Sequence, residues 1–239
     1  ERLDEILPAM ASAGYNGAEI GFRHIQSVPP RHMSELLAAQ NLELVASHIG
    51  GNIEDLDQAQ NEQGMIGTVL EYLRATGTRR LMYSGLRYQS DEQLSRDIAM
   101  ISRAAKQCAD AGVRLLYHNH NWEFEADHRI MNRLLDESPE ELGLCPDVGW
   151  VAKAGVDVLE WLAAVADRIG AVHFKDFASY ETGMDPVELG KGVAPLAEVA
   201  KWMRESLTDT WVIAEQDSSK IPPADAAREN AAYLRSLFS

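Results

Sequence analysis

Short apolar runs alternate with helical patterns along this chain, and this alternation restricts the fold more than any other feature. Runs typical of strands lie at residues 18–21, 42–48, 80–83, 142–147, 171–176 and 211–217, and another begins at Val113. Between them, apolar residues recur at helical spacing over residues 3–10, 32–39, 65–75, 92–111, 129–135, 156–166, 196–205 and 224–237. Residues 51–62 are polar and are predicted to form a loop. Strands that alternate with helices predict a parallel sheet with helical crossovers.

The residues that end these strands favour a barrel over an open sheet. Each of the last five strands ends in polar residues at its carboxyl end, where TIM (β/α)8 barrels build their sites. An open doubly wound sheet often carries a Gly-rich phosphate turn, and the sequence contains neither GxGxxG nor a P-loop. No Gly/Ser linker or change of composition divides the chain. We therefore predict an α/β TIM barrel that forms a single domain over residues 1–239.

The strand count falls short of a closed barrel. About seven strands are predicted, one fewer than a TIM barrel needs. The explanation we favour is that the first strand lies upstream of Glu1. In that case we expect a gap between the first and the last strand of the given chain.

Charge and composition disfavour several classes of protein. The formal net charge is −15, so an acidic surface would repel the phosphate backbone of nucleic acid. No apolar run approaches the ~20 residues of a membrane span, and no signal peptide is visible. Cys108 lies in a helical pattern and Cys145 in a strand pattern, so both are predicted to be buried, reduced thiols of a cytoplasmic protein. Barrels of this kind often pair through helices and loops, so the sequence is compatible with a homo-oligomer.

The strand near the middle of the chain leads into a cluster of polar side chains. With a period of two, Leu116, His118 and His120 point to one face, and Tyr117 and Asn119 point to the other. A single histidine in such a place is more often a hydrogen-bonded core residue. Two histidines on one face, followed by further polar residues, favour a functional site.

Four potential metal ligands come from four successive strands, namely His118, Asp147, His173 and Glu215. The intervals of 29, 26 and 42 residues are each compatible with one strand–helix repeat. Two imidazoles and two carboxylates suit Mn²⁺, Zn²⁺, Fe²⁺ or Co²⁺ better than Ca²⁺. Each carboxylate alone is as readily explained by a salt bridge or a helix cap. Their convergence favours one divalent ion as the shared partner.

Other side chains are candidates for catalysis or for substrate binding. Lys175 lies two residues after His173 on the same face, where it would stabilise a substrate oxyanion or else pair with Asp176 or Glu215. Trp122 and Trp150 lie just past strand ends and would stack on a sugar ring or form an apolar lid. Glu123 is predicted to lie on the surface. The residues predicted to contact substrate are Glu19, His48, Asn119, Trp122 and Trp150.

Several motifs together resemble the xylose isomerase-like TIM barrels, also called the sugar phosphate isomerase/epimerase superfamily. They occur in the family's order and span nearly the whole chain: Gly14-Tyr15-Asn16-Gly17-Ala18-Glu19-Ile20, Tyr117-His118-Asn119-His120, Asp147-Val148-Gly149-Trp150, His173-Phe174-Lys175-Asp176, Leu189-Gly190-Lys191-Gly192 and Glu215-Gln216-Asp217. The resemblance implies a divalent ion held by Asp147, His173 and Glu215. The fourth ligand position falls on His118, where many members have glutamate, and Trp150 occupies a position where many have histidine. A two-glutamate epimerase mechanism therefore lacks its second carboxylate here.

The resemblance implies an enzyme that acts on a small sugar or keto-sugar through an enediolate. We expect a sugar isomerase or epimerase in which Glu215, or else His120, moves the proton next to a carbonyl. Lys175 would stabilise the oxyanion, and His48 would bind a substrate hydroxyl. The first alternative is a keto-sugar dehydratase or lyase, which the missing second glutamate favours.

Two further alternatives remain open at this point. One is an endonuclease for abasic DNA, which the negative charge and the small number of ligands disfavour. The other is a non-catalytic sugar-binding barrel, which the histidine at position 118 keeps open. No strong phosphate site is evident, and the loop Gly190-Lys191-Gly192 is the best candidate for one.

Overall fold

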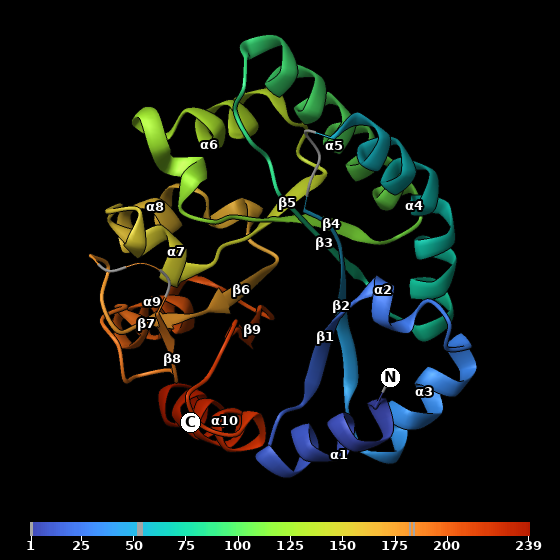
Figure 1. Ribbon diagram of the computed structural model, residues 1–239, viewed down its shortest axis with the longest axis vertical. Coiled ribbons are helices and arrows are strands. Elements are labelled where there is room, and N and C mark those ends of the chain that lie inside the picture. The colour runs from blue at the N-terminus through green and yellow to red at the C-terminus, as the bar shows by residue number, and fades with distance from the viewer. Residues whose placement is uncertain (1, 52–54, 182, 184) are drawn as a thin grey trace.

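The chain forms an inner ring of parallel strands with helices packed outside it (Figure 1). This computed structural model describes residues 2–51, 55–181, 183 and 185–239. The strands of the ring are β1 (Gly17–Gly21), β2 (Glu43–Gly50), β3 (Arg80–Ser84), β4 (Arg114–His118), β5 (Leu142–Cys145), β6 (Ala171–Phe174) and β9 (Trp211–Ala214). The outer helices are α1 (Leu3–Ala13), α3 (Pro30–Ala39), α4 (Leu56–Thr76), α5 (Asp91–Asp110), α6 (Glu125–Glu137), α8 (Val158–Ala164), α9 (Leu196–Ser206) and α10 (Pro223–Phe238). The predicted α/β TIM barrel is therefore confirmed.

Short elements follow the carboxyl ends of several strands. They are α2 (Phe22–Ile25), the 3-10 turn Trp122–Phe124, α7 (Val148–Lys153), and the small hairpin of β7 (Asp176–Phe177) and β8 (Pro186–Val187). A second 3-10 turn, Ala166–Arg168, precedes β6. In the described ranges, no helix has the length and apolar character that crossing a membrane requires.

The ring has an open seam between its first and last strands. Strands β1 to β5 pair in chain order, and β6 pairs with β9. Parallel bridges join Leu144 to Ile169 and Asp147 to His173, which connects β5 to β6. Among the described residues no backbone pairing joins β1 to β9, so the expected gap is present. Outside the seam α1 packs on α10, where Tyr15 donates a hydrogen bond to the Ala227 carbonyl (3.1 Å).

The apolar core lies in two layers. The larger layer fills the space between the strands and the outer helices. Helix α5 shows how the sequence produces it: Ser90 caps its first turn, and Leu94, Ile98, Ile101 and Cys108 form one buried face. The smaller layer lies inside the ring and consists of Ala46, Met82, Leu116, Cys145 and Ala171.

The inner apolar layer lies next to the potential metal ligands along the strands. Leu116, Cys145 and Ala171 each precede a potential ligand by two residues. Because side chains alternate along a strand, His118, Asp147 and His173 lie on the same inward face, one step nearer the carboxyl end of the ring. The packed layer beneath them closes the site from below.

Among the differences between the predicted and the observed elements, two concern helices beside the ring, α4 and α7. Helix α4 begins at Leu56, so most of the polar stretch 51–62 is helical, and residues 52–54 lie outside the described ranges. Asp55 caps this helix by accepting from the main-chain N–H groups of Asp57 and Gln58. Helix α7 was not predicted. It begins directly after Asp147, and a Cβ on its Gly149 would come within 2.4 Å of the Lys175 carbonyl oxygen, so the motif needs glycine for close packing on the next strand.

Both cysteines are free and buried, as predicted. Burial raises the pKa of Cys108 to about 12 and that of Cys145 to about 11. Only the thiolate is nucleophilic, and at pH 8 no more than about a thousandth of each thiol is ionised. We expect a disulfide reagent such as DTNB to label neither cysteine in the native protein and both in denaturant. Rapid labelling of the folded protein at pH 8 would contradict this burial.

Candidate metal centre

The four predicted ligands converge at the carboxyl end of the ring. His118, Asp147, His173 and Glu215 each offer one ligand atom, and these atoms all lie within 4.8 Å of one another. His118 Nδ1 is 3.9 Å from Glu215 Oε2, and the rings of His118 and His173 are 4.7 Å apart. The spacing of these residues in the sequence thus corresponds to one cluster in space.

Two of the four ligand residues carry a buried atom that makes no hydrogen bond to the described part of the chain. His118 Nδ1 and Asp147 Oδ2 have no hydrogen-bond partner among the described residues. The other oxygen of Asp147 accepts from the Trp150 N–H (3.0 Å), so the carboxylate caps α7 with one oxygen only. Burial raises the pKa of Asp147 to about 7, although Lys175 opposes this shift. Burial also lowers the pKa of His118 well below its usual value. A neutral imidazole and an unsatisfied carboxylate oxygen are the donors that a divalent ion needs, so the cluster fits one.

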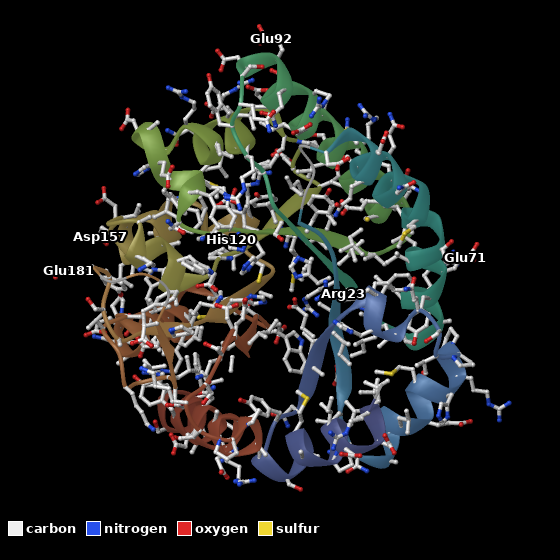
Figure 2. The ribbon with its side chains drawn as sticks, viewed as in Figure 1. Arg23, Glu71, Glu92, His120, Asp157 and Glu181 are labelled. Atoms are coloured by element: carbon white, nitrogen blue, oxygen red, sulfur yellow. The ribbon has the colours of Figure 1, made fainter. Side chains whose placement is uncertain are left out.

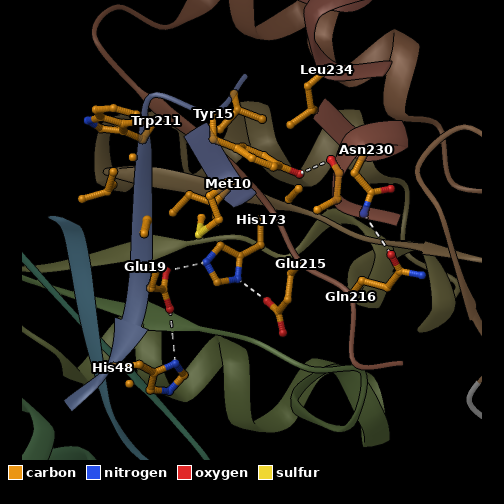
Figure 3. Close-up of a pocket in the computed structure, with 18 of the residues that line it drawn as sticks. Met10, Tyr15, Glu19, His48, His173, Trp211, Glu215, Gln216, Asn230 and Leu234 are labelled. Carbon is orange, nitrogen blue, oxygen red and sulfur yellow. Dashed lines mark hydrogen bonds and ion pairs between the residues drawn. The ribbon is translucent and has the colours of Figure 1, made fainter. Parts of the chain in front are cut away.

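His173 lies between two carboxylates (Figure 3). Its Nε2 is 2.9 Å from Glu19 Oε2, and its Nδ1 is hydrogen-bonded to Glu215 Oε2. Burial alone would lower the pKa of His173, but Cys145 and the two carboxylates raise it well above its usual value. Burial alone would raise the pKa of Glu19, but His173 and His48 lower it to about 2.

Lys175 is buried among carboxylates. Its Nζ donates to Glu215 Oε1 (2.9 Å) and to Asp217 Oδ2 (3.0 Å), and lies 3.7 Å from Asp147 Oδ2. Burial alone would lower the pKa of Lys175, but these three carboxylates raise it. The ammonium also lies 4.8 Å from the ring centroid of the buried Trp150, so the two side chains pack against each other. Of the two ion pairs predicted for Lys175, the one with Glu215 is present.

His120 lies beside the cluster and near the middle of the ring (Figure 2). Its ring centroid is 4.9 Å from that of His118, and it stacks on Trp122 at 3.9 Å. The Arg87 guanidinium covers the other face of Trp122, 3.3 Å from the ring centroid. Both faces of Trp122 are therefore occupied, so this residue supports His120 and offers no free face to a sugar.

Two neighbouring side chains, Asn119 and Glu123, make buried hydrogen bonds that the sequence did not predict. Asn119 is buried, and its amide accepts from the Asp147 N–H (3.0 Å) and donates to the Asp147 carbonyl (3.4 Å). It links the end of β4 to the main chain that follows β5, so both its amide oxygen and its amide nitrogen are engaged with the protein. The prediction that Glu123 lies on the surface is wrong, because the side chain is fully buried. Glu123 accepts from Tyr117 Oη (2.7 Å) and from the His120 N–H (2.8 Å).

The burial of Glu123 has a local signal. In a capping box, a glutamate in the first turn of a helix accepts a hydrogen bond from the main-chain N–H three residues earlier. Glu123 does so to His120, three residues earlier. Tyr117 in turn accepts from the Leu86 N–H (2.9 Å), so the network also fixes the loop after β3.

The glycine-rich loop at residues 190–192 is bound by a carboxylate of the protein itself. The buried Asp176 carboxylate accepts from the N–H groups of Phe177, Gly190, Gly192 and Ala194, each at 3.0 Å. A Cβ at position 192 would lie 2.2 Å from Asp176 Oδ1, so glycine is required there. The N–H groups that a phosphate would need are already used, and the expectation of a phosphate site in this loop is not supported.

A cavity of about 1770 Å³ runs along the seam (Figure 3). Glu19, His48, His173 and Glu215 line its inner wall, and it extends outward to Tyr15 and Leu234. Its volume exceeds the roughly 300–1,000 Å³ of most small-molecule pockets. A substrate the size of a sugar therefore has room to reach the cluster.

Comparison with known proteins identifies the family. The profile of the Xylose isomerase-like TIM barrel family matches residues 7–237. The inosose dehydratase of Lacticaseibacillus casei is 23% identical over 266 residues, which cover 97% of this chain and 88% of that protein.

Solved structures resemble the whole chain. The probable 3-DHS dehydratase AsbF of Bacillus anthracis has a TM-score of 0.82 at 14% identity, covering 97% of this chain and 93% of that one. The IolI protein with bound zinc has a TM-score of 0.81 at 15% identity, with coverage of 100% and 94%. An L-ribulose 3-epimerase has a TM-score of 0.79 at 17% identity, with coverage of 99% and 88%. At such identities the likeness concerns the fold.

Proposed function

The chain belongs to the xylose isomerase-like TIM barrel family, and from that premise we propose that it is a divalent-metal-dependent dehydratase of a small keto-polyol such as an inosose. The observation that carries the proposal is the enclosed cluster of His118, Asp147, His173 and Glu215, with Lys175 hydrogen-bonded into it. The match over nearly the full length of an inosose dehydratase supports loss of water over isomerisation.

The four residues of the cluster would hold the ion. When bound, the ion supplies Lewis acidity that makes a hydrogen next to a ketone easier to remove. We propose Mn²⁺, Zn²⁺, Co²⁺ or Fe²⁺ as this ion, because mixed nitrogen and oxygen donors suit these metals. Zinc occupies the IolI protein of the same fold.

The chain's own residues would move the protons. Glu215 is our choice for the base that takes the hydrogen from the carbon next to the ketone, because its carboxylate faces the cavity. Lys175 would donate a hydrogen bond to the oxygen that gains negative charge. His120 would give a proton to the hydroxyl that departs from the neighbouring carbon. A carbon–carbon double bond and one water molecule then result, and the atoms balance.

Sugar isomerisation or epimerisation is the second candidate. The likeness in fold to an L-ribulose 3-epimerase and the match to the xylose isomerase-like family favour it. It would use the same base and the same cluster, but it would return the proton to carbon instead of expelling a hydroxyl. An epimerase that moves protons between two carboxylates would need a second one near the ion, and His118 occupies the expected position.

Metal content tests the cluster first. We expect purified protein, after reconstitution with Mn²⁺ or Zn²⁺, to hold about one tightly bound ion per chain and His118→Ala to lose most of it. Elemental analysis after gel filtration measures this. The control is His32→Ala, an exposed histidine on α3, which should leave the content unchanged. Wild-type protein without metal after reconstitution would refute the metal centre.

The fate of the substrate separates the two reactions. The loaded protein incubated with an inosose should give a product lighter by one water, detected by mass spectrometry. An isomerase or epimerase in D₂O would instead give a product that has lost no water and in which one hydrogen on carbon is replaced by deuterium from the solvent. Deuterium incorporation without loss of water would therefore replace the dehydratase proposal by the second candidate.

A further inference from the structure

Glu19 touches the metal centre without belonging to the ligand cluster. Its Oε2 lies 2.9 Å from His173 Nε2, and it reaches the imidazole from β1, on the far side of the seam from Glu215 (Figure 3). We propose that Glu19 is a positioning residue of the centre, which fixes the orientation and tautomer of His173 and so raises the affinity for the ion. This inference rests on the proposed metal centre and assigns to Glu19 a role other than substrate binding.

The two nitrogens of His173 face different groups. Nδ1 lies against Glu215, which is in the cluster, whereas Nε2 lies against Glu19, which is not. The geometry makes Nδ1 the ligand atom and Nε2 the N–H that donates to Glu19. A second hydrogen bond of this kind holds the ring in place and increases the basicity of the ligand nitrogen.

Glu19 is itself held in place. Its other oxygen lies 3.4 Å from His48 Nδ1, and His48 Nε2 is hydrogen-bonded to Ser84 Oγ at 3.0 Å. The Glu19 side chain is 11% exposed, so both carboxylate oxygens are directed at imidazoles and little of the group is open to a ligand. Residues from β1, β2 and β3 thus form a single chain of polar contacts that ends at His173.

The contact also crosses the seam. Among the described residues no backbone pairing joins β1 to β9, yet Glu19 of β1 and Glu215, directly after β9, both contact the ring of His173. His173 therefore links the two sides of the seam inside the ring. Loss of the contact from β1 would remove one of the two hydrogen bonds to carboxylates that fix the orientation of the imidazole.

The test compares ion affinity in Glu19 variants of the full chain. We expect Glu19→Ala to weaken the binding of Zn²⁺ or Mn²⁺ about 10–100-fold, measured by competition with a chromophoric chelator. Glu19→Gln keeps an oxygen that can accept from His173 Nε2, so its loss should be smaller. Glu43→Gln, an exposed carboxylate on β2 at the other end of the same cavity, is the matched control and should bind as the wild type does.

The outcomes separate this inference from the proposed function. If wild-type protein binds no ion, the metal centre itself fails. If the wild type binds and Glu19→Ala binds equally well, the positioning role alone is overturned, and a rise in KM without a change in ion affinity would return Glu19 to the substrate. Circular dichroism checks that the variants fold. Where the alanine variant does not fold, Glu19→Gln carries the test, and an unchanged affinity together with a changed KM would overturn the inference.

Discussion

Replacing Glu215 by glutamine is expected to lower turnover about a thousandfold or more while the fold survives. The side chain contacts His173 and Lys175 and approaches His118, so its negative charge lies at the centre of the cluster. Those contacts hold the pKa of Glu215 well below its usual value, against the effect of burial. Glutamine has nearly the same shape, but it can neither take a proton nor offset the charge of an ion.

Metal analysis of the same variant separates two roles of Glu215. A glutamine variant that keeps its ion and loses turnover would identify Glu215 chiefly as the base. Loss of the ion would identify it chiefly as a ligand. Glu205→Gln, on the exposed face of α9, serves as the control and should turn over normally. Near-normal turnover of Glu215→Gln would remove Glu215 from the mechanism altogether.

Replacing Asp176 by alanine is expected to lower the free energy of unfolding by about 3–5 kcal/mol. The buried carboxylate accepts four main-chain N–H groups, from Phe177, Gly190, Gly192 and Ala194. Alanine leaves these donors without an acceptor, and each buried unsatisfied donor costs roughly 1–3 kcal/mol unless water reaches it. Urea unfolding followed by tryptophan fluorescence measures the loss.

Two further variants define the cause of that loss. Asp176→Asn keeps one acceptor oxygen, so it should lose less stability than the alanine variant. Asp185→Ala removes a carboxylate just before β8 that, within the described residues, forms its ion pair with the exposed Lys220, and it should change stability by less than about 0.5 kcal/mol. Equal stability of Asp176→Ala and the wild type would show that the loop does not depend on this carboxylate.

Most of the fold could be predicted from the sequence because local patterns determine it. The alternation of apolar runs and helical patterns predicts every strand of the ring to within a few residues. The start of α4 could not be read from hydrophobic periodicity, because the first turns of that helix are polar and are fixed by the cap at Asp55. Helix α7 is only six residues long, too short for a periodic signal.

The sequence predicts the metal ligands of the site but not the contacts that support them. The ligands could be found because period two and the strand ends place them on one inward face. The partners of the other polar side chains come from distant segments, and spacing carries no information about them. Asn119 binds the main chain of Asp147, and Arg87 covers Trp122, and neither contact could be predicted from the spacing of these residues.

Helices α1 and α10, which pack on each other outside the seam, restrict the order of folding. Tyr15 reaches Ala227, 212 residues later, and Arg235 donates to the Ala13 carbonyl, 222 residues earlier. A protein is synthesised from its N-terminus, and contacts between distant residues are slow to form. A nascent chain that ends before Glu215 has three of the four ligands and no α10 to dock on α1. The ion can therefore find its complete set of ligands only after Glu215 has been synthesised, when β9 and α10 can join β1 and α1.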